Sequence, residues 1–189
     1  MIRIAVVGDI GSGKSYIAKL FNYPIFNADL EVAKIYKTNK QCFKRIKNIL
    51  PEYFLSFPIK KEEIIKAIVA NPINLKKITK IIHPEIKKKL EIFLKKNQKR
   101  SAVILDIPLL LENKLNKRED IIIFIQSNKL EIIKRLKKRK DFNLGLLNKF
   151  KKIQLPLEYK KKKSHFIIKN NFTNKLVRID VKKILKKTL

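Results

Sequence analysis

Short apolar segments alternate with longer amphipathic segments along the chain. Five segments are rich in β-branched and other apolar residues, and we predict strands at Ile2–Val7, Pro24–Ala28, Ala102–Asp106, Ile121–Ile125 and His165–Lys169. The central segments are continuous apolar runs, which is typical of parallel strands covered by helices on both faces. Strands that alternate with helical segments predict an α/β fold with a doubly wound parallel sheet.

The segments between these strands have helical periodicity. The clearest apolar stripes are Ile64, Ile65, Ile68 and Val69, and then Val177, Val181, Ile184 and Leu185. More than seventy residues separate the second and third strands, which is far more than one crossover needs. We therefore predict a helical insertion at about 31–98, and a second, very basic helical segment at about 130–163.

The composition is that of a globular protein. The chain has 189 residues, of which 45% are hydrophobic and 33% charged, so we expect one domain, residues 1–189, that carries insertions. A single cysteine, Cys42, excludes an internal disulfide and fits a reducing compartment. No apolar run approaches the roughly 18 residues of a membrane-spanning helix, so we expect a cytoplasmic protein without a membrane partner.

The net charge of +30 would attract any polyanion, which raises the hypothesis of a nucleic-acid-binding protein. However, most of the 46 basic residues are lysines, whereas specific recognition of bases favours arginine. No aromatic-rich RNA-binding signature is interleaved with the lysines. We interpret the charge as solvated lysine faces without a specific nucleic-acid partner, and the same field would favour a small anionic substrate.

The residues Gly8–Ser15 read GDIGSGKS and fit the phosphate-binding pattern G-x-x-x-x-G-K-[ST] at every fixed position. The pattern follows a predicted strand and opens a predicted helix, which is the context that it requires. Glycines let backbone N–H groups turn toward a phosphate, and the helix N-terminus adds partial positive charge. Lys14 would reach the β- and γ-phosphates, and the Ser15 hydroxyl would bind Mg²⁺.

Three classes of P-loop protein compete: a GTPase switch, a small-molecule kinase and a nucleic-acid-dependent NTPase. The run Asn128–Glu131 resembles the guanine-reading N-K-x-D of GTPases. A GTPase also needs D-x-x-G, yet the only glycine outside the loop is Gly145, and Phe142 stands three residues before it. The sequence therefore excludes the GTPase class.

A kinase needs a base for the acceptor hydroxyl and cations for the migrating phosphoryl group. Asp29 follows the second predicted strand, at the sheet edge where parallel α/β folds bind ligands, so it is a candidate base. The alternative is an N-cap for a helix that begins at Leu30. Asp106 ends the third strand and is either a Walker-B-like carboxylate for Mg²⁺ or a turn residue before a proline.

Arg135 and Arg139 stand one helical turn apart and share a helix face. Two guanidinium groups in a basic segment are typical of a lid that closes over a triphosphate. For Arg135, a solvated basic face is the alternative.

Together these motifs resemble the dephospho-coenzyme A kinase family. The resemblance covers nearly the whole chain, in family order, at Gly8–Ser15, Asn27–Asp29, Ile81–Ile86, Asp106–Glu112, Arg135–Arg139, Gln154–Lys160 and Ile167–Asn170. It implies transfer of the ATP γ-phosphoryl group to the ribose 3′-hydroxyl of dephospho-coenzyme A, the last step of coenzyme A synthesis. It also implies a three-layer P-loop fold with a five-stranded parallel sheet, a helical acceptor-binding insertion and a helical lid.

The resemblance assigns roles by motif match. ATP would contact Gly8, Gly11, Ser12, Gly13, Lys14, Ser15, Tyr16 and Arg139. Asp29 would be the base and Lys14 the second catalytic residue, with Ser15 and Asp106 on Mg²⁺ and Arg135 in the lid. His83 matches the H-P element of the insertion on the substrate side, although it could simply start a helix before Pro84. We expect a monomer or weak oligomer.

The chain departs from the family pattern at several positions. Asn27 replaces the first acid of D-A-D, Asp9 a loop glycine, Lys34 an arginine, Lys149 or Phe150 a lid arginine, and Phe172 a glycine after the last strand. These changes bear on rate and ligand contacts more than on the reaction. The alternatives are a kinase for another metabolite, such as a nucleoside monophosphate, and a basic nucleic-acid-dependent NTPase.

Overall fold

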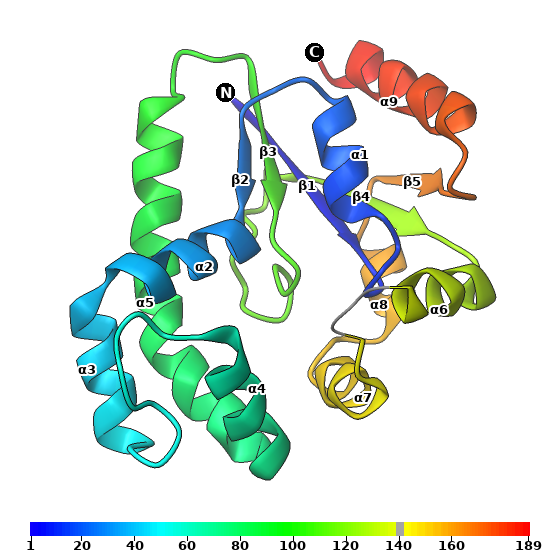
Figure 1. Cartoon of the computed structure of the whole chain (residues 1–189). Helices are drawn as coiled ribbons and strands as arrows, with labels where there is room; N and C mark the ends of the chain where they lie inside the picture. Colours follow the sequence, from blue (N-terminus) through cyan, green and yellow to red (C-terminus); the bar gives the residue numbers. More distant parts are fainter. Residues whose placement is uncertain (139–141) are drawn as a thin grey trace. The chain divides into compact units, whose positions relative to one another are not determined.

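The computed structural model describes residues 1–138 and 142–189, and its five strands form one parallel sheet. The strands are β1 (Ile2–Gly8), β2 (Ile25–Asn27), β3 (Ala102–Asp106), β4 (Ile121–Gln126) and β5 (Phe166–Lys169). Their order across the sheet is β2-β3-β1-β4-β5 (Figure 1). All five predicted strands are confirmed, each within one residue at either end, and so is the α/β class.

The described helices connect these strands or extend from them. They are α1 (Lys14–Leu20), α2 (Ala28–Thr38), α3 (Lys40–Ile49), α4 (Lys61–Ala70), α5 (Pro72–Lys96), α6 (Lys129–Lys137), α7 (Leu144–Lys152), α8 (Leu157–Lys162) and α9 (Asn174–Thr188). The chain divides into two compact units. The sheet unit consists of Met1–Asn27, Leu94–Phe142 and Ile153–Leu189, and the helical unit of Ala28–Phe93 and Asn143–Lys152.

The sheet unit places the phosphate-binding loop at a topological switch point. β1 lies between β3 and β4. After β1 the chain forms β2 and β3 on one side of this strand, and then crosses over to form β4 and β5 on the other side. Ligands of open parallel sheets bind at the carboxyl ends of strands at such a point. The loop Gly8–Ser15 follows the carboxyl end of β1, so the topology puts it where an anionic ligand is expected.

Helices α1 and α9 contact each other and pack on the sheet (Figure 1). The predicted α9 stripe is confirmed, because Val177, Val181 and Ile184 are buried in the same core as Ile17 and Phe21 of the α1 segment. This packing anchors the helix that follows the phosphate-binding loop.

The helical unit joins α2, α3, α4 and most of α5 to α7. Helix α7 is tied to α4 by Lys149, whose Nζ donates to the carbonyl oxygens of Ile68 (3.1 Å) and Val69 (2.7 Å). A lysine at the end of a helix satisfies carbonyl groups that lack helical partners and complements the negative end of the helix dipole. In the predicted α4 stripe, Ile68 is buried but Val69 is exposed, so the inward face is narrower than predicted.

Helix α5 runs through Pro84 without ending there. The interpretation of His83 as a helix-starting residue is therefore wrong. A proline inside a helix removes one backbone hydrogen bond. Here Ile82 and Ile86 are buried on either side of Pro84, and the burial of their side chains offsets the loss of this hydrogen bond.

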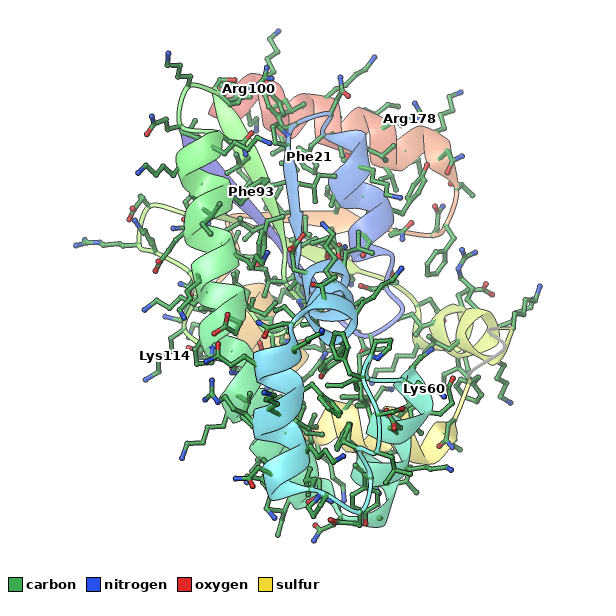
Figure 2. All side chains as sticks on the ribbon, turned by 60° about the vertical axis from the view of Figure 1, so that its left-hand side comes forward. Phe21, Lys60, Phe93, Arg100, Lys114 and Arg178 are labelled. Atoms are coloured by element: carbon green, nitrogen blue, oxygen red, sulfur yellow. The ribbon has the colours of Figure 1, made fainter. Side chains whose placement is uncertain are left out.

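Many nitrogen-tipped side chains point away from the ribbon (Figure 2). Lys87, Lys88 and Lys89 of α5, for example, are all exposed, as are Lys186 and Lys187 of α9. These lysines are therefore exposed to solvent. Among the described helices, none combines the length and the apolar composition needed to cross a lipid bilayer.

Candidate functional site

The phosphate-binding loop needs glycine at two positions for reasons of shape. Gly11 and Gly13 have φ values of 84° and 91°, which lie in the left-handed region. A Cβ on Gly13 would lie 2.5 Å from Nδ2 of Asn170, and one on Gly11 would lie 3.0 Å from Cγ of Leu136. The loop therefore adopts its turn only with glycines, and neighbouring side chains close tightly around it.

Lys14 begins α1 and folds back over the loop. Its Nζ donates to the carbonyl oxygens of Gly8 (3.3 Å) and Asp9 (2.7 Å), and its side chain is mostly buried. Both acceptors are backbone carbonyl groups of the loop, and the two hydrogen bonds orient the ammonium group within it. Ser15 and Tyr16 follow in the first turn of α1 and are exposed.

Two other strand ends hold the loop through the carbonyl oxygen of Ser12. This oxygen accepts hydrogen bonds from Ser127 Oγ (3.0 Å), after β4, and from Asn170 Nδ2 (2.8 Å), after β5. The Ser12 hydroxyl is buried and has no hydrogen-bond partner in the described structure. Asn170 belongs to the motif Ile167–Asn170, but the local sequence does not indicate its role, because its partner lies 158 residues away.

Asp106 and Asn27 form a pair at the neighbouring strand ends. β2 and β3 are in register at these residues, and Asn27 Nδ2 donates to Asp106 Oδ2 over 2.6 Å. An aspartate at position 27, as in the family pattern, would place two carboxylates in contact, which disfavours ionisation of both. The amide instead replaces repulsion by a hydrogen bond and orients the buried Asp106 carboxylate.

Asp29 lies in the first turn of α2, because the helix begins at Ala28. The alternative interpretation of Asp29 as the N-cap of a helix from Leu30 is therefore wrong. The side chain is exposed and comes two residues after the end of β2. A carboxylate in the first helical turn interacts favourably with the positive end of the helix dipole.

Glu112 and Lys160 form a buried ion pair that the motif analysis did not pair. Lys160 Nζ lies 2.6 Å from Glu112 Oε1, with 1% and 9% of the two side chains exposed. The same oxygen accepts a hydrogen bond from the Leu155 amide (3.0 Å). The pair fastens α8 and the segment before it to the chain that follows Asp106. Both residues belong to quoted motifs, but only the fold brings them together.

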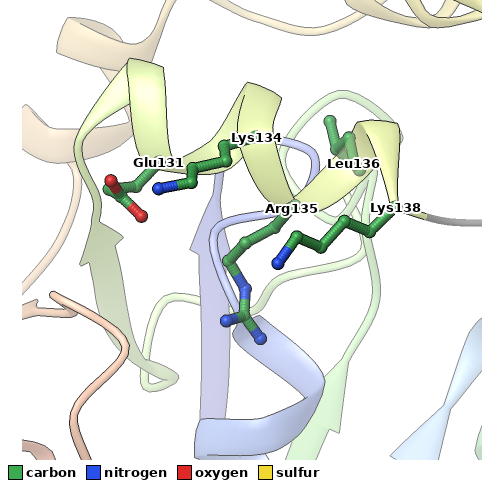
Figure 3. Close-up of a pocket in the computed structure, with 6 residues that line it drawn as sticks. Glu131, Lys134, Arg135, Leu136 and Lys138 are labelled. Carbon is green, nitrogen blue, oxygen red and sulfur yellow. The ribbon is translucent and has the colours of Figure 1, made fainter.

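A pocket of about 470 Å³ opens beside the phosphate-binding loop. It is lined by Gly11, Glu131, Lys134, Arg135, Leu136 and Lys138. The Arg135 side chain extends toward the start of α1, and the Lys138 side chain runs toward that of Arg135 (Figure 3). Three of the six lining residues are cationic, which suits a phosphorylated ligand. Arg139, the second predicted lid arginine, lies outside the described residues.

The remaining predicted residues lie in different surroundings. Tyr16 donates from its hydroxyl to Asn174 Oδ1 (2.7 Å), which links α1 to α9. His83 lies within α5 of the helical unit, and partial burial of the imidazole lowers its pKa. Its neutral form is therefore favoured, and it is suited to accept a hydrogen bond or donate one rather than to contribute charge.

Comparisons with known proteins agree on one family. A family model described as Dephospho-CoA kinase matches residues 2–175. The dephospho-CoA kinase of Wolbachia pipientis wMel is 31% identical over 187 residues, covering 96% of this chain and 95% of that protein. A crystal structure from Thermus thermophilus has a TM-score of 0.82 at 24% identity, covering 100% of this chain and 97% of that one. Dephospho-CoA kinase from Campylobacter jejuni has a TM-score of 0.64 at 24% identity, with 98% and 96% covered.

Proposed function

We propose, from the premise that this chain belongs to the dephospho-CoA kinase family, that Lys14, Asp29 and Asp106 divide the work of phosphoryl transfer. The chain is an ATP-dependent kinase that phosphorylates dephospho-coenzyme A in coenzyme A biosynthesis. The group transferred is the γ-phosphoryl of ATP, and the acceptor is the ribose 3′-hydroxyl. The observation that carries the assignment is the organised loop Gly8–Ser15, with its buried lysine at the carboxyl edge of the sheet.

The loop binds the phosphates of ATP. Its backbone N–H groups and the N-terminus of α1 provide partial positive charge, and Lys14 exchanges the carbonyl oxygens of Gly8 and Asp9 for phosphate oxygens. The anchoring of Ser12 by two neighbouring strand ends supports this role, because a loop that is already ordered loses little entropy on binding. Ser15, Tyr16 and Arg139 complete the ATP contacts by motif match.

Asp29 acts as the general base. As the 3′-hydroxyl oxygen attacks the γ-phosphorus, its proton passes to the Asp29 carboxylate, and ADP leaves. The position of Asp29 directly after β2 supports this role, since the end of β2 is paired with the end of β3 at Asp106. His83 and Arg135 are assigned to the acceptor and lid contacts.

Ser15 and Asp106 would hold Mg²⁺. A hydroxyl and a carboxylate are hard oxygen donors, and Mg²⁺ binds few protein ligands beside phosphate and water, so the residues fit this ion. When bound, Mg²⁺ neutralises charge on the transferring phosphates. The hydrogen bond from Asn27 holds the Asp106 carboxylate in one orientation for this purpose.

One assay tests the function against its alternatives. ADP release is measured with dephospho-coenzyme A, with a panel of nucleoside monophosphates, and with RNA in place of an acceptor. We expect ADP only with dephospho-coenzyme A, together with a product that carries one additional phosphate on the ribose. Turnover with a nucleoside monophosphate would instead indicate a different metabolite kinase. ATP hydrolysis stimulated by RNA, with a steep salt dependence, would indicate the nucleic-acid-dependent class.

Size-exclusion chromatography of the same protein tests the expected monomer or weak oligomer.

A further inference from the structure

Phe172, in the loop between β5 and α9, has an unusual backbone for a bulky residue. Its φ is 63°, in the left-handed region that disfavours side chains with a Cβ. The family pattern has glycine here, so the conformation belongs to the loop and the ring is what this chain adds. Asn170 holds the turn, because its Oδ1 accepts a hydrogen bond from the Phe172 amide (2.9 Å). A disfavoured conformation that is held in place points to a use for the side chain.

The Phe172 ring lies against the phosphate-binding loop. Its Cε1 atom is 3.7 Å from the position that a Cβ on Gly13 would occupy. Asn170, which holds the Phe172 amide, also donates to the carbonyl oxygen of Ser12 (2.8 Å). The turn that carries the ring is therefore hydrogen-bonded to the loop through Asn170, and the ring lies near Gly13.

The face of the ring carries the guanidinium of Arg135. The guanidinium carbon lies 4.4 Å from the ring centroid, which is within the range of a cation–π contact. Arg135 is exposed on α6 and lines the pocket together with Gly11 of the loop. An exposed arginine samples many rotamers, and a flat partner restricts the planar guanidinium to few of them.

We propose that Phe172 is a positioning residue of the nucleotide site, whose ring holds the Arg135 guanidinium beside the phosphate-binding loop so that it contacts bound ATP. The inference rests on the proposed function only in taking ATP as the ligand. Since the ring acts by presenting a flat π face, aromatic replacements keep the effect and an aliphatic residue of similar size loses it. The same contact orders Arg135 before ATP arrives.

The first test measures ATP affinity by calorimetry for wild type, Phe172→Leu, Phe172→Tyr and Arg135→Ala. The strength of exposed cation–π contacts predicts that Phe172→Leu weakens ATP binding about two- to fivefold. Phe172→Tyr should bind as wild type does, and kcat at saturating ATP should stay within about twofold in both. In the Arg135→Ala background, Phe172→Leu should have no further effect, because its target is gone. Wild-type affinity in Phe172→Leu, or an equal loss in the Arg135→Ala background, would overturn the proposal.

The second test uses fluorescence, since the chain contains no tryptophan. Phe172→Trp supplies a single reporter that keeps the cation–π face. Its emission should change on saturation with ATP. The control is Tyr159→Trp in α8, where the native ring carries an exposed cation, Lys163, at 5.8 Å, and its emission should not respond. No response from Phe172→Trp, or the same response from both variants, would contradict the proposal.

Failure of the two proposals can be told apart. A wild-type protein that binds ATP but leaves dephospho-coenzyme A unmodified refutes the function, while the affinity comparison at Phe172 still decides the present inference. A protein that phosphorylates dephospho-coenzyme A with unchanged ATP affinity in Phe172→Leu refutes only the inference.

Discussion

The amino edge and the carboxyl edge of the parallel sheet both bury charged side chains, but they give them different partners. At the amino edge, Arg3 of β1 faces Asp120, which directly precedes β4. At the carboxyl edge, Lys14 follows β1 and donates to backbone carbonyl oxygens. At the amino edge two side chains of opposite charge contact each other, and at the carboxyl edge the lysine contacts the backbone of the loop that it follows.

The amino edge is held by groups from distant parts of the chain. Arg3 Nε lies 2.9 Å from Asp120 Oδ1, and a second guanidinium nitrogen donates to Asp120 Oδ2 over 3.0 Å. The Lys117 amide also donates to Oδ2 (2.9 Å). Next to this pair, His165 Nδ1 accepts a hydrogen bond from the Ile122 amide (3.0 Å) at the start of β4. The polar groups at this edge are paired with other groups of the protein, which is typical of residues that hold the fold together.

The Arg3–Asp120 pair is not a simple source of stability. Burial raises the pKa of Asp120 and outweighs the opposing effects of the Lys117 amide and the Arg3 charge. Desolvation therefore destabilises the ionised carboxylate more than the Lys117 amide and the Arg3 charge stabilise it. Such pairs are often replaceable as a unit, yet removal of one partner leaves a buried charge alone. The comparison teaches that the buried charges at the amino edge contact each other within the fold, whereas we assign the buried lysine at the carboxyl edge to phosphate binding.

The largest expected effect comes from Lys14→Ala at the carboxyl edge. Turnover should fall by at least about 10³-fold, because the cation that meets the β- and γ-phosphates is lost. The free energy of unfolding should fall by about 2 kcal/mol, because the hydrogen bonds to the carbonyl oxygens of Gly8 and Asp9 are lost. Steady-state kinetics and urea unfolding measure the two effects. Normal turnover in this variant would remove the loop from the mechanism.

Asp29→Asn should lower kcat about 10²- to 10⁴-fold and leave ATP binding largely unchanged. The amide keeps the size of the side chain but cannot accept the hydroxyl proton, and a base acts mainly in the transition state. The measurement is kcat at saturating substrates beside calorimetric ATP affinity. A kcat within a few-fold of wild type would mean that the base lies elsewhere.

Asp120→Leu at the amino edge should show the reverse pattern. We expect a loss of about 3–5 kcal/mol in the free energy of unfolding, because Arg3 loses both of its acceptor oxygens on this side chain and is left as an uncompensated buried charge. The double variant Arg3→Met with Asp120→Leu should recover most of this loss. Urea unfolding measures stability, and kcat of the folded fraction should stay within about twofold. The comparison of edges fails if the double variant is no more stable than the single one.

The smallest expected effect is a pH dependence at Asp120. Because burial raises the pKa of Asp120 in the folded state, the protonated carboxyl is more favoured there than it is in the unfolded chain. The contribution to stability is fully present below the unfolded pKa of about 3.9 and is lost as pH rises through the folded pKa. Carboxyl NMR should place the Asp120 midpoint above the unfolded value. The unfolding free energy of wild type relative to that of Asp120→Asn should fall as pH rises, by an amount set by the difference between the folded and unfolded pKa. A midpoint at or below the unfolded value would contradict this prediction.

Local sequence determined the strands and the phosphate-binding loop. The apolar runs predicted five strands because parallel strands must be apolar on both faces, and the glycines of Gly8–Ser15 predicted the turn because only glycine adopts it without strain. These features depend on neighbours within a few residues. Local rules for caps and breakers also suggested the two alternatives that the structure excludes, a helix that begins at Leu30 and one that begins before Pro84.

Only the tertiary structure decided which distant groups meet. Arg3 and Asp120 are 117 positions apart, Ser12 and Asn170 are 158, and nothing in local periodicity pairs them. The same holds for Glu112 with Lys160 and for Arg135 with Phe172. A pattern of residues specifies an element and its apolar face, but charge pairing and ring stacking depend on distances of a few ångströms. Those distances are set when all strands and helices pack together. Local sequence therefore determined which residue types form the site, and the tertiary structure determined which distant groups surround them.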